Sequence, residues 1–364
     1  MHSAAGADRT RLLIAPAVAT PGERRLAAIL AGAAALAFAV IVPFARTPLG
    51  VTASFIPSYE AALVCIDLIT AVMLFDHFLR LRSAPVLALA AGYLFDAMII
   101  VPHALSFPDA FASAGVIGGG PQTTAWLYVF WHGGFALFVL AYALLRRREM
   151  GGRLPPIGEP RAALLVTAGG VAALVFLLTA ATIWGHDWLP AMIRGGDYSM
   201  AVTKGITPTV WLLTLIALVV LWQPQPRAID LWLMLVVWVW LFDIALSSII
   251  GSSRFDLGWY AGRIFGLIAA SFLLVALLVE LARFYTGALD AAASAELRLA
   301  ELLRTRPSLD LKPDREGADT FIERQNIANY RLLLGSATLD DAQRRAIEAL
   351  LAEEEAKLAS KLAR

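Results

Sequence analysis

The sequence predicts an all-α membrane protein, a polytopic bundle of about eight transmembrane helices with a short cytoplasmic helical tail. Hydrophobic residues make up 59% of the 364 residues and charged residues only 16%, whereas soluble domains carry about 25% charged residues. Long apolar runs recur along the chain, and about 20 apolar residues let one helix cross a bilayer. No segment has the alternating pattern that is typical of transmembrane strands.

We expect residues 1–25 to form a cytoplasmic N-terminal segment and residues 26–285 to form the membrane domain. The first apolar run is long for the core of a signal peptide, which favours a retained span, and its removal as a signal peptide is the alternative. The predicted spans are residues 26–44, 57–79, 84–101, 123–145, 162–184, 206–222, 228–250 and 259–282.

The basic residues beside these spans predict the orientation, because cytoplasmic loops carry an excess of Lys and Arg. The richer side holds Arg9, Arg11, Arg24, Arg25, Arg80, Arg82, Arg146, Arg147, Arg148, Arg153, Arg161 and Arg227. The poorer side holds Arg46, Arg194, Lys204 and Arg254. We therefore expect both termini in the cytoplasm and the loop 102–122 outside.

Ionisable residues inside the apolar runs are the candidates for function, because such residues are costly at bilayer depth. A rise of about 1.5 Å per helical residue places all of them in the outer half of the bilayer. Asp243 and Arg263 lie on consecutive spans with opposite charges, so we expect a structural ion pair between them. Glu60 is expected near the outer entrance of its span, where it can reach water. The candidates are Asp67, Asp96, His132, Asp243 and Arg263.

Asp67, Asp96 and His132 have two interpretations. They hold helices together, or they form a ligand- or proton-sensing site that opens outward, to which we add His103 from the loop. Buried carboxylates and imidazoles can change protonation near the external pH, which suits a pH or cation sensor. His103 and His132 could together ligate haem or a metal, but no motif spacing supports this. We predict no metal, no cofactor and no catalytic residue.

The same residues fall within a series of motifs that resembles a known family. In order along the chain these are Phe55-Ile56-Pro57, Gly92-Tyr93-Leu94-Phe95-Asp96, Pro102-His103, Phe107-Pro108, Gln122-Thr123, Trp126-Leu127-Tyr128, Trp131-His132-Gly133 and Trp259-Tyr260-Ala261-Gly262-Arg263. They resemble the membrane-associated sensor domains of the MASE class, specifically its fourth family, over roughly residues 20–285. The resemblance implies a sensory input module of a bacterial signalling protein, which usually feeds a histidine kinase or a cyclic-dinucleotide enzyme.

The tail after the last span differs from what is usual in this family, in which a catalytic output domain follows the sensor. It is too short for a kinase or cyclase domain and has no signature of either, so we expect no catalytic output domain. Residues 286–317 are predicted to form a signalling helix and a linker, and residues 318–364 a cytoplasmic helical hairpin with two facing apolar stripes. A hairpin this small buries little core, so it would gain stability from a partner.

We therefore predict a non-enzymatic, multi-pass sensor of a bacterial inner membrane. It would detect a signal from the outer side or within the lipid bilayer and relay it through its last span to a separate cytoplasmic kinase, cyclase or response regulator. A homodimer is the simplest assembly, and the net charge of +1 gives no sign of a nucleic-acid partner. The alternative is an ion-coupled transporter or permease that uses the intramembrane Asp and His residues.

Overall fold

The computed structural model describes residues 18–113, 115–185, 187–194, 197, 199–251, 253–305, 320–335 and 339–363. The regular elements of this described part are helices. Those up to residue 284 are α2 (Pro21–Ile41), α3 (Phe55–Leu81), α4 (Ala84–Ser106), α5 (Thr123–Met150), α6 (Pro160–Trp184), α7 (Ser199–Thr203), α8 (Ile206–Leu221), α9 (Ala228–Ile244) and the first part of α10 (Leu257–Thr305). A 3-10 turn, Val42–Phe44, extends α2, and a π-helical turn, Ala245–Ile250, extends α9.

Within the described residues, 7 helices are long and apolar enough to cross a membrane. The remaining predicted span, residues 206–222, lies in α8, which has only 16 residues and so covers about 24 Å, less than the ~30 Å of a hydrocarbon core. The all-α fold class is confirmed, because every predicted span lies in a helix.

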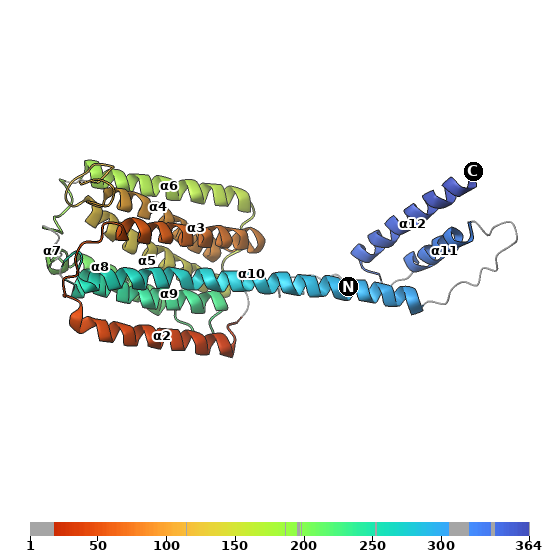
Figure 1. The fold of residues 1–364 in the computed structure, drawn as a ribbon, viewed down its shortest axis with the longest axis horizontal. Helices are drawn as coiled ribbons and strands as arrows, with labels where there is room; N and C mark the ends of the chain where they lie inside the picture. The colour runs from red at the N-terminus through yellow and green to blue at the C-terminus, as the bar shows by residue number, and fades with distance from the viewer. Residues whose placement is uncertain are drawn as a thin grey trace. The chain divides into compact units, whose positions relative to one another are not determined.

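The chain divides into two compact units, residues 1–284 and 285–364. In the first unit α9 is the most deeply buried candidate span, whereas α2 and α6 are the least buried. Figure 1 shows α2 beside α9 on one side of the bundle and α6 on the opposite side. The outward side chains of α6 are apolar, among them Leu165, Val166 and Phe176. Such a surface suits contact with lipid.

Helix α10 packs closely on α9 because glycines face it there. A Cβ at Gly262 would lie 2.8 Å from the backbone oxygen of Asp243 and 2.8 Å from the Cβ of Ser247. A Cβ at Gly266 would lie 2.9 Å from Oδ2 of Asp243. Small residues let transmembrane helices approach at this distance, so these two glycines set the position of α10 against the centre of the bundle.

The second unit contains α11 (Phe321–Leu334) and α12 (Asp341–Leu362). The start of α11 is tied to the end of α12, because Lys361 Nζ lies 2.6 Å from Glu323 Oε1, so the helices run antiparallel. This hydrogen bond lowers the pKa of the Glu323 carboxyl. Asp340 caps α12 by accepting from the backbone N–H groups of Ala342 and Gln343. The predicted linker falls largely on residues 306–319, which lie outside the described residues.

Gly262→Ala should destabilise the protein by about 1–3 kcal/mol, because the added methyl group meets backbone that cannot move aside. Gly169→Ala is the matched control, since nothing lies within 4 Å of its Cβ, and its effect should stay within about 1 kcal/mol. Thermal unfolding of both variants in one detergent measures the difference. A Gly262→Ala variant that unfolds at the same temperature as the wild type would contradict this packing.

Candidate functional site

The ionisable residues predicted from the sequence all lie buried inside the bundle. Asp67 is on α3, Asp96 on α4, His132 on α5, Asp243 on α9 and Arg263 on α10. None is more than 5% exposed. We call these five residues the polar layer. The structure does not gather them in one cluster but distributes them over two neighbouring groups and a pocket.

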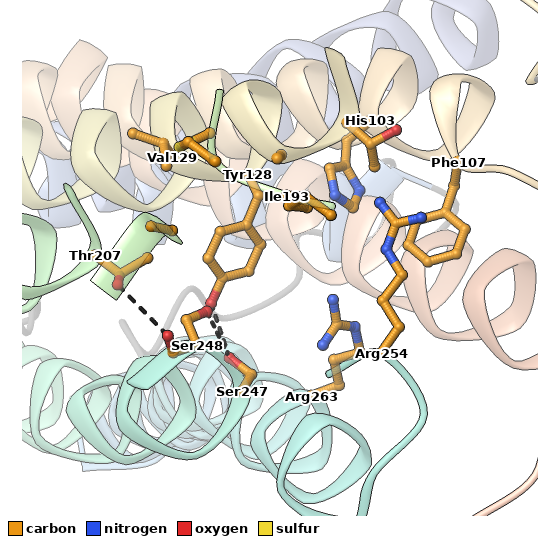
Figure 2. Close-up of a pocket in the computed structure, with 14 residues that line it drawn as sticks. His103, Phe107, Tyr128, Val129, Ile193, Thr207, Ser247, Ser248, Arg254 and Arg263 are labelled. Atoms are coloured by element: carbon orange, nitrogen blue, oxygen red, sulfur yellow. Dashed lines mark hydrogen bonds between the residues drawn. The ribbon is translucent and has the colours of Figure 1, made fainter. Parts of the chain in front are cut away.

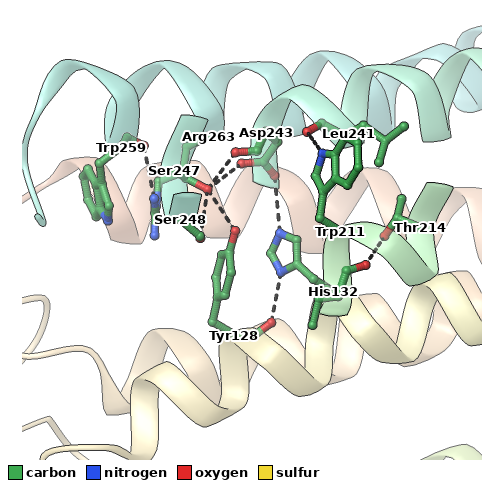
Figure 3. Close-up of polar contacts among 11 residues, drawn as sticks. Tyr128, His132, Trp211, Thr214, Leu241, Asp243, Ser247, Ser248, Trp259 and Arg263 are labelled. Carbon is green, nitrogen blue, oxygen red and sulfur yellow. Dashed lines mark hydrogen bonds and ion pairs between the residues drawn. The ribbon is translucent and has the colours of Figure 1, made fainter. Parts of the chain in front are cut away.

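The first group is centred on His132 and Asp243 (Figure 3). Nε2 of His132 lies 3.3 Å from Oδ2 of Asp243, and Nδ1 lies 3.0 Å from the backbone oxygen of Tyr128. Ser247 donates to Asp243, at 2.8 Å from its backbone oxygen and 3.2 Å from Oδ1. The hydroxyl of Tyr128 lies 2.9 Å from that of Ser247.

The contact between the imidazole and the carboxylate can be a hydrogen bond only if one of the two groups carries a proton there. The backbone oxygen of Tyr128 can only accept, so Nδ1 of His132 carries a hydrogen. A neutral ring would then present a bare Nε2 to Asp243, so the contact requires one more proton, on the ring or on the carboxyl. The His132–Asp243 pair is therefore a candidate proton-binding site.

The expected ion pair between Asp243 and Arg263 does not form in the structure. Arg263 instead stacks on Trp259, with its guanidinium carbon 3.8 Å from the ring centroid, and donates to the Trp259 backbone oxygen at 3.1 Å. The reason is helix rotation: Asp243 faces Gly262 and Gly266 of α10, and the residue after Gly262 points about 100° away around the helix.

The second group comprises Asp67 and Asp96, which line one small cavity together with Asp243, Tyr93 and Trp240. The Tyr93 hydroxyl, the Trp240 indole N–H and Oδ1 of Asp96 are buried there without a hydrogen-bond partner among the described residues. The cavity thus brings three of the intramembrane carboxyls to one place. His132 is absent from its lining and approaches Asp243 from α5.

His103 lies elsewhere than the sequence predicts. It sits in the last turn of α4, which continues through Pro102, rather than in an outer loop. Its Nδ1 lies 2.8 Å from Oε1 of Glu60, and both side chains are at most 2% exposed. The expectation that Glu60 reaches water is therefore wrong. Among the residues that the structure describes, no group of three or more His, Cys, Asp or Glu could hold a metal ion.

A partly open pocket is lined by Tyr128 and Ser247, which also contact the His132–Asp243 pair. Figure 2 shows this pocket. It encloses about 430 Å³ of empty space, counting its mouth. Its polar lining includes two arginines, Arg254 and Arg263. The position of Arg254 in a loop predicts only an exposed charge. We call this cavity the arginine pocket, and its polar side chains are His103, Thr124, Tyr128, Thr207, Ser247, Ser248, Arg254 and Arg263.

A further buried polar cluster was not predicted from the sequence, because Arg146 served there only as a basic residue beside a span that indicates orientation. Arg146 is 3% exposed and its Nη2 lies 3.6 Å from Oδ2 of Asp230. The Tyr142 hydroxyl donates to Asp230 at 2.5 Å. Asp230 also accepts from the backbone N–H of Arg227, at 3.1 Å. This cluster fixes α5 against α9 near the predicted cytoplasmic end of both helices.

The fold and the buried polar layer define a multi-pass integral membrane protein. Residues 50–285 match the family described as MASE4, membrane-associated sensor, integral membrane domain. The chain belongs to this family, which confirms the resemblance, although α2 lies before the matched residues. Neither a curated protein nor a solved structure matches the chain. The matched family makes the membrane unit a signal-input domain.

His132→Ala should destabilise the protein by about 3–5 kcal/mol, because it leaves Asp243 buried without its partner. His77→Ala is the matched control: His77 makes the same type of bond, from Nδ1 to the backbone oxygen of Met73 at 2.8 Å, and none to a carboxylate. Loss of this hydrogen bond should lower the free energy of unfolding by about 1 kcal/mol.

Adding Asp243→Asn to His132→Ala should restore part of the lost stability, because it removes the orphaned charge. Unfolding of the wild type and these three variants in detergent measures this. Equal losses for His132→Ala and His77→Ala, with no recovery in the double variant, would contradict the pairing.

Proposed function

We propose that this chain is a sensory input protein of a bacterial inner membrane that passes a signal through α10 to a separate cytoplasmic partner. The observation that carries the proposal is the continuity of α10 from Leu257 to Thr305. The same helix presents Gly262 and Gly266 to Asp243 and carries Arg263 into the arginine pocket. A change in the polar layer can therefore act directly on the helix that leaves the membrane.

The proposed direction of signalling runs from outside to inside. The arginine-rich flanks would be cytoplasmic, with both termini, and α7 with the loops around it would lie outside. The polar layer is then closer to the outer surface. Protonation of the His132–Asp243 pair, or a ligand in the adjoining pocket, would shift α10 by the small helix displacement that switching proteins use, about 1–2 Å.

The proposed output is a protein contact and not a reaction. Only the sensor domain is identified in the chain, so a kinase, cyclase or response regulator would act in trans. The α11–α12 hairpin supports a docking role because it leaves apolar side chains exposed, including Ile322, Leu332 and Leu362. A homodimer would bring two such hairpins to one partner.

The small cavity between α3, α4 and α9 favours a second candidate function, that of an ion-coupled transporter. Asp67, Asp96 and Asp243 line it together, and His132 could complete a proton relay through its contact with Asp243. Proteoliposomes that contain only this chain distinguish the two functions. Solute-coupled proton flux would establish the transporter, whereas a sensor moves no solute.

Photo-cross-linking in native membranes tests the sensor. A photo-reactive residue at Ile322 or Leu332 should capture a kinase, cyclase or response regulator. The control position is Phe111, which is similarly exposed (56%) but lies in the loop after α4, on the opposite side by the proposed orientation. Capture of the same protein from Phe111, or of only further copies of this chain from the hairpin, would contradict a relay to a cytoplasmic partner.

A further inference from the structure

The arginine pocket holds two guanidinium groups that stack on aromatic rings. Arg254 lies over Phe107, 4.7 Å from its centroid, and Arg263 over Trp259, at 3.8 Å. The N–H groups of a guanidinium lie in its plane, so stacking occupies its face and leaves the donors available. Figure 2 shows both arginines among the side chains that line the cavity.

Most of these donors have no acceptor within the part of the chain that the structure describes. Arg254 makes no hydrogen bond to the described residues, and its Nε is buried without a partner. Arg263 is 5% exposed and donates only to the backbone oxygen of Trp259 within the described part of the chain. A buried cation without a counter-ion is strongly unfavourable. Arg263 is such a cation, whereas Arg254 is partly exposed and buries its Nε without a partner among the described residues.

Nearby carboxylates form their hydrogen bonds with other groups, and within the described residues none of them accepts from either guanidinium. Glu60 binds His103 at 2.8 Å, and Asp243 meets His132 and Ser247. Asp256 accepts from the backbone N–H of Trp259 at 2.7 Å. Neither guanidinium forms an ion pair with a carboxylate in the described residues.

We propose that the arginine pocket binds a small organic carboxylate with a short apolar tail. The planar guanidinium fork matches a carboxylate with two parallel hydrogen bonds. The hydroxyls of Tyr128, Thr207 and Ser247 offer further polar contacts in the same lining.

The apolar lining selects an organic carboxylate over inorganic phosphate. Val129, Met192 and Ile193 form part of the wall, and Met192 and Ile193 are buried. Phosphate has no apolar part to place against these side chains, whereas the tail of a short carboxylic acid is removed from water there. The ligand class is therefore that of acetate, propionate and butyrate.

Occupancy of this pocket would join α10 to the rest of the bundle. Arg263 comes from α10, Ser247 from the π-helical turn, Tyr128 from α5 and Thr207 from α8. That the carboxylate is the sensed signal rests on the proposed function, whereas its binding does not.

Binding to the purified full chain in detergent tests the assignment, by calorimetry with acetate, propionate and butyrate. The neutral amides of the same acids are the ligand controls, and inorganic phosphate is the competing anion. Wild type should bind at least one carboxylate and none of the amides. Arg254→Gln should weaken that binding about ten-fold or more, and Arg254→Lys, which keeps the charge without the fork, should weaken it less.

Arg194→Gln is the matched control, because Arg194 is exposed and absent from the pocket lining, and it should bind as the wild type does. Equal binding of acids and amides, equal loss in both glutamine variants, or tighter binding of phosphate would overturn the proposal. If no carboxylate binds while the hairpin still captures a signalling protein, the ligand is wrong and the sensor stands. If the carboxylate binds and the hairpin captures no signalling protein, the ligand assignment stands and the proposed sensor function fails.

Discussion

The burial of the Asp243 carboxyl is the constraint on which the membrane unit depends. An ionisable group in an apolar bundle is tolerated only when neighbouring groups partner it. His132 of α5 and Ser247 of the π-helical turn supply these contacts. Gly262 and Gly266 leave room for the carboxyl against α10. The spacing of α5, α9 and α10 therefore follows from the need to give the buried Asp243 carboxyl room and hydrogen-bond partners.

The same interactions link the His132–Asp243 pair to the arginine pocket. Tyr128 provides the backbone oxygen that orients His132, and its hydroxyl lies 2.9 Å from Ser247. Both Tyr128 and Ser247 also line the pocket. A proton on the pair and an anion in the pocket would thus share two residues, and any coupling between their affinities would be reciprocal.

The sequence predicted the membrane helices well because length and hydropathy are local properties. It failed where the outcome depends on helix rotation or tertiary contact. Their charges and depths predicted an ion pair between Asp243 and Arg263. In the structure Gly262 faces Asp243, and Arg263 lies over Trp259 instead. The third span was predicted to end at residue 101, before Pro102, although α4 continues through Pro102 and buries His103.

Three other residues were misjudged for a related reason. Glu60, Arg146 and Arg254 were interpreted from their position near span ends, where charged side chains usually reach water. The structure buries Glu60 and Arg146 and leaves a buried donor on Arg254. One sequence does not say which helices are neighbours, so such contacts could not be predicted. The glycines of α10 were the available signal, since their spacing marks a closely packed helix face.

The central claim is that the state of the polar layer is transmitted along α10. Hydrogen exchange of residues 286–298, measured on the full chain in lipid nanodiscs, tests it most directly. Asp243→Asn should change the exchange of this segment. Asp76→Asn is the control, because Asp76 forms only an exposed pair with Arg80, and it should leave the exchange as in the wild type. Identical exchange in the wild type and both variants would contradict transmission through α10.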